Sequence, residues 1–151
     1  MSRPEYDSID QIIRARAGDT NPAILFEDER WTWDEHVRAS AARGALYRSL
    51  CAPGEHIGYL FDNIPELSFW IGAGATSGAP LVGINPTRQG AELQRDITFT
   101  DCRLIVTESR WAGLLEGLDL GVDAPHVLVV DTPEYAARLA PFADAELPPE
   151  P

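Results

Sequence analysis

The stretch PGEHIGYLFDNIPELSFWIGAGATSGAPLVGINP, residues 53–86, decides the fold. Its Pro-Gly turn leads into an apolar run at residues 56–61, which is typical of a buried strand. Pro65 suits the first turn of a helix expected over residues 66–77, and Gly78 and Pro80 end that helix. A second strand is expected at residues 81–84. Strand, helix and strand in this order predict a parallel crossover unit.

The same alternation continues on both sides of this stretch. Upstream, Ser8 caps a short helix to about Ala17, residues 23–26 and 30–32 form a small hairpin, and a capping box at Thr32 and Glu35 begins a helix to about Leu50. Downstream we expect a helix at 89–100, a strand at 103–107, a short helix at 111–118 and a strand at 126–130. The predicted class is α/β, with a mostly parallel sheet flanked by helices.

Residues 1–140 are expected to form this domain, and the proline-rich, acidic residues 141–151 are expected to be a linker or tail.

The amino-acid composition limits which molecules this chain can bind and which chemistry it can perform. The chain has 151 residues, a formal net charge of -12 and a pI of about 4.5, so its surface repels nucleic acid and anionic lipid. All twelve basic residues are arginine, so these residues offer no lysine for phosphate binding or Schiff-base chemistry. Cys51 and Cys102 share no metal-binding spacing with the histidines and are expected to be reduced and mostly buried.

The chain shows no targeting or membrane signal. Its first seven residues are polar and acidic, unlike a signal peptide, and the longest nearly apolar run, residues 67–75, is shorter than the roughly 20 residues of a membrane span. We therefore expect a cytoplasmic protein without a transmembrane segment.

Two patterns suggest ligand sites, and each has a simpler explanation. Gly72, Gly74 and Gly78 follow an apolar stretch, as in a dinucleotide-binding turn, but Pro80 stands where the phosphate-binding helix should begin. Small residues inside a tightly packed helix explain the same letters. Asp131 follows an apolar strand, where phosphoryl acceptors and magnesium ligands often lie, but its supporting acidic pair and lysine are missing. We interpret it as the start of a turn before Pro133.

No residue is assigned a catalytic or metal-binding role. The histidines at 36, 56 and 126 have no serine elbow or second partner in the sequence. Arg88 and Arg95 flank the helix after Asn85-Pro86, where two guanidinium groups could meet an anionic ligand, although surface solubility explains them equally well.

From Ala23 onward the order of segments resembles the N-terminal region of the adenylate-forming acyl-CoA synthetases, also called fatty-acid-CoA ligases. The resemblance covers residues 23–110 and keeps the spacing between its pieces. Those pieces are TWDE at 32–35, PGEHIG at 53–58, DNIPEL at 62–67, the apolar helix at 71–80, GINPT at 83–87, EL at 92–93 and DCRLIVT at 101–107. The family's Ser/Thr/Gly-rich phosphate loop, [YF]-T-S-G-[ST]-T-G-x-P-K, would follow residues 127–131 and does not occur in this sequence; residues 76–80 share three of its letters but lie too early.

This resemblance implies one subdomain of a large N-terminal domain. The complete enzyme would use ATP and Mg²⁺ to activate a fatty acid and then transfer the acyl group to coenzyme A. We expect this chain to supply scaffold only, to bind no cofactor by itself and to be inactive in isolation, with the remainder of the same polypeptide as its partner. Arg88 and Arg95 are then candidate contacts for the CoA phosphates.

Two other interpretations stay open. A stand-alone α/β interaction or dimerisation module would have a polar surface, whereas an enzyme fragment should expose an apolar face; a homodimer is compatible with either. A small nucleotide-binding domain is the third alternative, and NAD should stabilise it.

Overall fold

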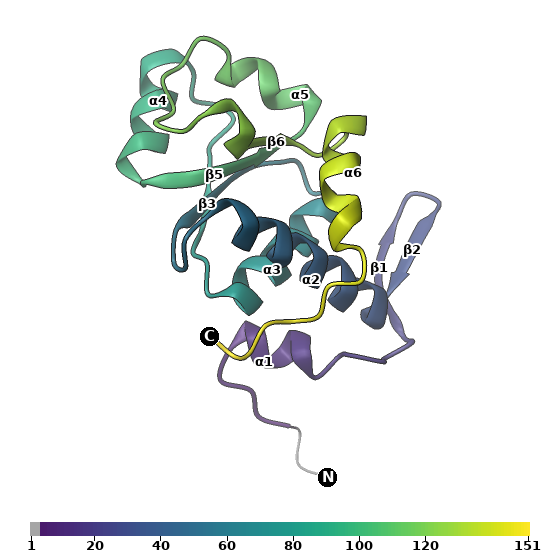
Figure 1. Cartoon of the computed structure of the whole chain (residues 1–151). Coiled ribbons are helices and arrows are strands. Elements are labelled where there is room, and N and C mark those ends of the chain that lie inside the picture. Colours follow the sequence, from purple (N-terminus) through teal and green to yellow (C-terminus); the bar gives the residue numbers. More distant parts are fainter. Residues whose placement is uncertain (1–3) are drawn as a thin grey trace.

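The computed structural model describes residues 4–151 and contains two sheets (Figure 1). The larger sheet has four parallel strands in the order β4-β3-β5-β6, formed by β3 (His56–Leu60), β4 (Leu81–Gly83), β5 (Cys102–Thr107) and β6 (Val127–Val129). The smaller is an antiparallel hairpin of β1 (Pro22–Phe26) and β2 (Glu29–Thr32), with Glu27 at a positive φ of 51° in its turn. The α/β class and the hairpin are confirmed.

Helices cover both faces of the parallel sheet. On one face lie α2 (Trp33–Leu50), α3 (Pro65–Ser77) and α6 (Pro133–Leu139), and on the other lie α4 (Gly90–Phe99), α5 (Ser109–Ala112) and the 3-10 turn η1 (Gly113–Leu115). Strand β5 shows the alternation that produces this layering, because Leu104 and Val106 join the first core while Ile105 joins the second. Figure 1 shows the sheet between the two groups of helices.

The start of α2 is fixed by its sequence. Thr32 accepts a hydrogen bond from the Glu35 amide at 3.2 Å, and the Glu35 carboxylate accepts one from the Thr32 amide at 2.7 Å. The capping box predicted from Thr32 and Glu35 is therefore confirmed.

The glycines of α3 serve helix packing. A Cβ on Gly72 would lie 2.1 Å from the Ser40 hydroxyl of α2, and a Cβ on Gly74 would lie 1.9 Å from a methyl of Leu81. Gly78 ends the helix in the left-handed region at φ 66°. These residues form no phosphate-binding turn, which supports the packing interpretation.

Two predicted helices are shorter in the structure. The first helix, α1, spans Ile9–Arg14 and gives way to turns before Gly18, which has φ 77°. The helix expected at 111–118 consists of α5 and η1 and ends at Leu115, because Gly117 takes a φ of 73° that turns the chain away. Leu118 lies beyond this end but still packs against the core.

The C-terminal segment follows the surface of α2. After the 3-10 turn η2 (Ala124–His126), β6, α6 and a last turn η3 (Ala140–Phe142), residues 143–147 border a groove with Val37 and Ala41 of α2. Pro151 reaches α1 and Gly78, as the yellow end of the chain in Figure 1 shows. The role of residues 141–151 as a linker stays a prediction.

Candidate functional site

The carboxyl edge of the parallel sheet is the first place to seek a ligand. Strand β4 is added on one side of β3, and β5 and β6 are added on the other side. The direction in which successive strands are added therefore reverses between β3 and β5, although all four strands are parallel. Open α/β sheets bind ligands in the crevice at such a switch point. The loops that follow β3 and β5 therefore decide what this edge can hold.

These loops are joined by their own polar contacts. Glu108, which follows β5, accepts a hydrogen bond from the Asp62 amide after β3 at 2.7 Å. Arg110 forms an ion pair with the Asp62 carboxylate, and Thr107 donates to the Leu60 carbonyl at 2.9 Å. The edge between β3 and β5 is thus filled by side chains of this chain.

Asp131 has a structural role at the same edge. It lies in the turn after β6 and accepts hydrogen bonds from the Ser109 amide at 2.8 Å and the Ser109 hydroxyl at 2.9 Å. Burial opposes ionisation of Asp131, but the bonds from Ser109 outweigh it and hold the pKa of Asp131 below the usual aspartate value. The turn interpretation of Asp131 is confirmed, and its carboxylate fixes the start of α5.

This edge does not fit ATP and Mg²⁺ by itself. The Asp62, Glu108 and Asp131 carboxylates would repel a triphosphate, and the Asp62 and Ser109 amides that could bind phosphate already bind carboxylates. Within residues 4–151 no three His, Cys, Asp or Glu side chains gather as they would around a metal ion.

Arg88 and Arg95 lie in different surroundings. Arg88 precedes α4 and contacts Glu92 at 3.5 Å and Asp96 at 3.4 Å, so its charge is partly neutralised. Arg95 lies further along α4, is exposed, and forms no ion pair with the residues that the structure describes. The two arginines therefore differ in charge environment, because only Arg88 is paired with carboxylates of α4.

Sequence reasoning missed a buried polar cluster between α2, α3 and α6. Arg43 of α2 forms a two-pronged ion pair with Glu66 of α3, and its Nε lies 2.8 Å from Glu66 Oε2. Tyr135 of α6 donates to the same oxygen at 3.0 Å, and burial raises the pKa of Tyr135, which keeps its hydroxyl protonated as a donor. Arg43 also stacks on the Phe69 ring at 4.8 Å. Glu66 stood in the DNIPEL motif, but its distant partners gave no local signal.

A second polar contact continues the seam between α2 and α3. His36 Nε2 lies 2.8 Å from the Ser68 hydroxyl, and the ring packs against Phe69 with centroids 5.4 Å apart. Burial lowers the pKa of His36, the Arg43 charge lowers it further, and the Ser68 contact opposes both. His36 is therefore neutral near pH 7 and serves as a packed hydrogen-bonding group.

The cysteines differ in exposure. Cys102 is buried and Cys51 half-buried, and both are free thiols. Burial raises the pKa of Cys51 to about 11, which leaves little thiolate near neutral pH.

Relatives identify the class of this fold. Two solved structures superpose on nearly the whole chain: the anthranilate CoA ligase AuaEII (TM-score 0.80, 18% identity, 98% of this chain and 30% of that one) and the N-terminal domain of FACL13 from Mycobacterium tuberculosis (TM-score 0.75, 18% identity, 95% and 38%). The fold is that of the N-terminal subdomain of adenylate-forming enzymes. No protein-family model matches the chain.

Sequence similarity relates the chain to the acyl-CoA ligases among the adenylate-forming enzymes. The chain is 45% identical over 140 residues to the steroid-22-oyl-CoA synthetase of Rhodococcus jostii and 33% identical over 146 residues to the medium/long-chain-fatty-acid–CoA ligase FadD17 of M. tuberculosis. These matches cover 92% and 95% of this chain but only 25% and 28% of the relatives. The chain therefore matches the N-terminal portion of acyl-CoA ligases and spans about a quarter of the length of these relatives. None of the helices described is long and apolar enough to cross a membrane.

Proposed function

We propose that this chain is the N-terminal scaffold of a ligase that joins a large apolar carboxylic acid to ATP and then transfers the acyl group to coenzyme A. The observation that carries the proposal is the 45% identity to a CoA synthetase across 92% of the chain. The two curated relatives are named for a steroid acid and for medium and long fatty acids, which favours a large apolar acyl group.

The same proposal assigns the chemistry to residues outside this chain. The family's phosphate loop does not occur in the 151 residues, and the carboxyl edge of the sheet is acidic and closed by Asp62, Glu108 and Arg110. In this view the chain works through its fold and its contacts with the remaining polypeptide.

Turnover by the isolated chain tests the scaffold role. With ATP, Mg²⁺, a fatty acid and CoA, the purified chain should release no pyrophosphate, and clear turnover would refute the proposal. A chimera in which this chain replaces the N-terminal quarter of the Rhodococcus enzyme should form acyl-CoA. A chimera that folds but stays inactive would show that this chain does not serve a ligase of this kind.

Arg88 and Arg95 stay proposed contacts for CoA phosphates. The free charge of Arg95 supports its assignment, whereas Arg88 would have to leave Glu92 and Asp96. In the chimera, Arg95→Gln should raise the KM for CoA about tenfold with little change in the KM for ATP, as expected for the loss of one charge-assisted hydrogen bond. Arg103→Gln is the matched control, because Arg103 is also exposed but pairs with Asp101. Equal KM values for CoA in both variants would contradict the assignment.

A further inference from the structure

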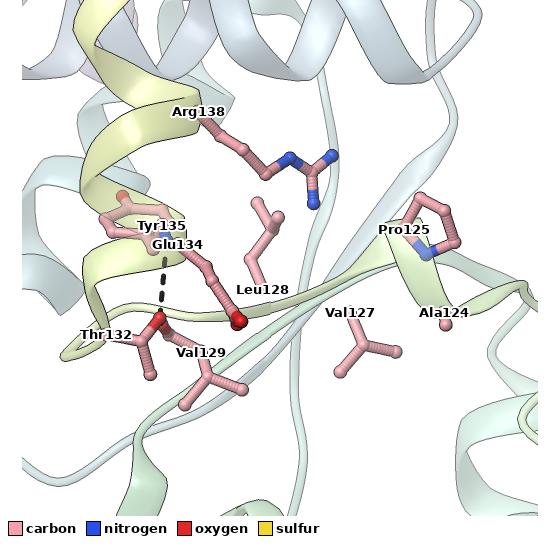
Figure 2. A pocket seen from close by; sticks show the side chains of 9 residues that line it. All are labelled: Ala124, Pro125, Val127, Leu128, Val129, Thr132, Glu134, Tyr135 and Arg138. Atoms are coloured by element: carbon pink, nitrogen blue, oxygen red, sulfur yellow. Dashed lines mark hydrogen bonds between the residues drawn. The ribbon is translucent and has the colours of Figure 1, made fainter.

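The outer edge of β6 carries no neighbouring strand among the residues that the structure describes. One side of β6 pairs with β5 through Ile105↔Val127, Val106↔Leu128 and Thr107↔Val129, and β6 is the last strand of the sheet. Beside its other side lies a groove of about 450 Å³, lined by β6, Pro125 and the side chains of α6 (Figure 2).

The backbone groups of β6 show which positions face this groove. The Val130 amide donates to Thr107 of β5 at 2.9 Å, so the alternation of a strand turns the Leu128 amide toward β5 and the Val129 amide away from it. The Val127 amide binds the Ala124 carbonyl, and the Val129 carbonyl accepts from the Thr132 hydroxyl at 2.6 Å. The Val129 N–H and the Val127 C=O are left without a partner among the residues described.

These two groups have the spacing of a strand-binding edge. In a parallel ladder, one residue of the incoming strand donates to the carbonyl before the paired residue and accepts from the amide after it. Val127 and Val129 flank Leu128 in this way. Unpaired strand edges bind extended segments readily, and each unpaired buried group is costly.

Features of the chain limit which polypeptide segment could pair with the outer edge of β6. Residues 143–151 run along α2 to α1 and do not enter the groove. A second copy is disfavoured because each chain carries a net charge of -12. The relatives are about four times as long as the part that this chain matches, so their polypeptides supply further segments.

The groove also offers a positive group. Arg138 of α6 forms no ion pair with the described residues, although Glu134 lines the same groove. Figure 2 shows the Arg138 guanidinium extending past Leu128 on the side of Pro125. A carbonyl or carboxylate of an incoming segment could accept from it.

We infer that the outer edge of β6 binds an extended strand from the C-terminal part of the ligase polypeptide and so continues the parallel sheet across the boundary of this chain. The inference rests on the proposed function, because it takes the partner to be the rest of a ligase.

Amide hydrogen exchange in the isolated chain and in the Rhodococcus chimera tests it directly. The Leu128 amide should be protected in both proteins, since it faces β5. The Val129 amide should exchange rapidly in the isolated chain and at least about 100-fold more slowly in the chimera. Equal exchange of the Val129 amide in both proteins would overturn the inference.

Proline substitution gives a second test. Proline is tolerated in edge strands where the lost N–H faces outward. Val129→Pro should therefore shift the unfolding midpoint of the isolated chain by less than about 3 °C. It should lower the midpoint of the chimera clearly more, because there the Val129 N–H is paired. Val129→Ala keeps the N–H and should spare the chimera, whereas Leu128→Pro should unfold both proteins. Severe loss in the isolated Val129→Pro chain, or an unaffected chimera, would contradict a free edge.

The results for the chimera test the strand inference and the proposed ligase function separately. A folded chimera without acyl-CoA synthesis defeats the proposed ligase role, while the exchange of its Val129 amide still reports on the edge. An active chimera with an unprotected Val129 amide defeats only the strand inference. A chimera that does not fold would overturn both.

Discussion

Glu66 connects three helices through a single carboxylate. It binds Arg43 of α2 and Tyr135 of α6, and the Arg43 side chain retains only 9% of its exposure. Loss of one member of a buried pair leaves the other charge without compensation. Glu66 of the DNIPEL segment, residues 62–67, therefore has a structural role.

Removing this carboxylate should destabilise the chain strongly. Glu66→Gln should lower the free energy of unfolding by about 3 kcal/mol, because the Arg43 guanidinium stays buried with a neutral neighbour. Arg38→Ala is the matched control: its partner is Asp34, its side chain is 71% exposed, and its loss should cost less than about 1 kcal/mol. Urea unfolding of both variants measures the difference, and equal costs would show that burial does not matter at Arg43.

His36 should make stability depend on pH. Its pKa is lowered from the ordinary 6.5, chiefly by burial, so the unfolded chain takes up a proton at a higher pH than the folded one. Stability is then fully present above about pH 6.5 and falls as the pH drops toward the folded pKa. The carboxylates with lowered pKa values, such as Asp131, act in a more acidic window.

Substituting His36 isolates this contribution. When the pH is lowered from 7.5 to 5, the free energy of unfolding should decrease in the unsubstituted chain. It should decrease less in His36→Gln, which keeps a hydrogen-bonding side chain near Ser68. Parallel pH profiles for the two proteins would remove His36 as the cause.

At the scale of elements, α2 and α3 pack closely because small residues meet along their contact. Gly72 lies against Ser40, and a Cβ on Gly44 would lie 2.7 Å from the Ser77 hydroxyl. This is the reason that α3, with Trp70 fully buried, tolerates few larger side chains on this side.

Adding one methyl group to this contact should force the helices apart. Gly72→Ala should destabilise the chain by about 1–3 kcal/mol through overpacking, despite the better helix propensity of alanine. The double variant Ser40→Gly with Gly72→Ala should recover part of that loss. Gly113→Ala, where an added Cβ meets nothing within 4 Å, should change stability little. Thermal unfolding that ranks Gly113→Ala as the more harmful change would contradict close packing.

At the scale of the whole molecule, one apolar surface lies beside the hairpin. Leu25 is 74% exposed and Ile71 is 38% exposed, and both line a pocket of about 290 Å³ with Ile24, Ile64 and Leu67. Neighbouring exposed apolar side chains of this kind suit an interaction surface better than single scattered ones do. A scaffold that packs against further polypeptide should expose such an apolar face, whereas a stand-alone module should have a polar surface there.

Dye binding can separate these interpretations. The isolated chain should enhance the fluorescence of an apolar-surface dye, and Leu25→Ser with Ile71→Ser should reduce it markedly. Phe99→Ser is the control, because Phe99 is 86% exposed and is not part of this pocket. Weak dye binding by the unsubstituted chain would favour the stand-alone module.

The sequence by itself determined the alternating elements, the parallel sheet, the capping box at Thr32 and the resemblance to acyl-CoA ligases. These follow from local periodicity and from short motifs, which neighbouring residues carry. Only the tertiary structure decided that Glu66 joins Arg43 to Tyr135, that Asp62 and Glu108 close the carboxyl edge, and that β6 keeps an unpaired amide. Such features depend on residues far apart in the chain, whose meeting is fixed by how helices and strands pack and leaves no pattern in the sequence of either segment.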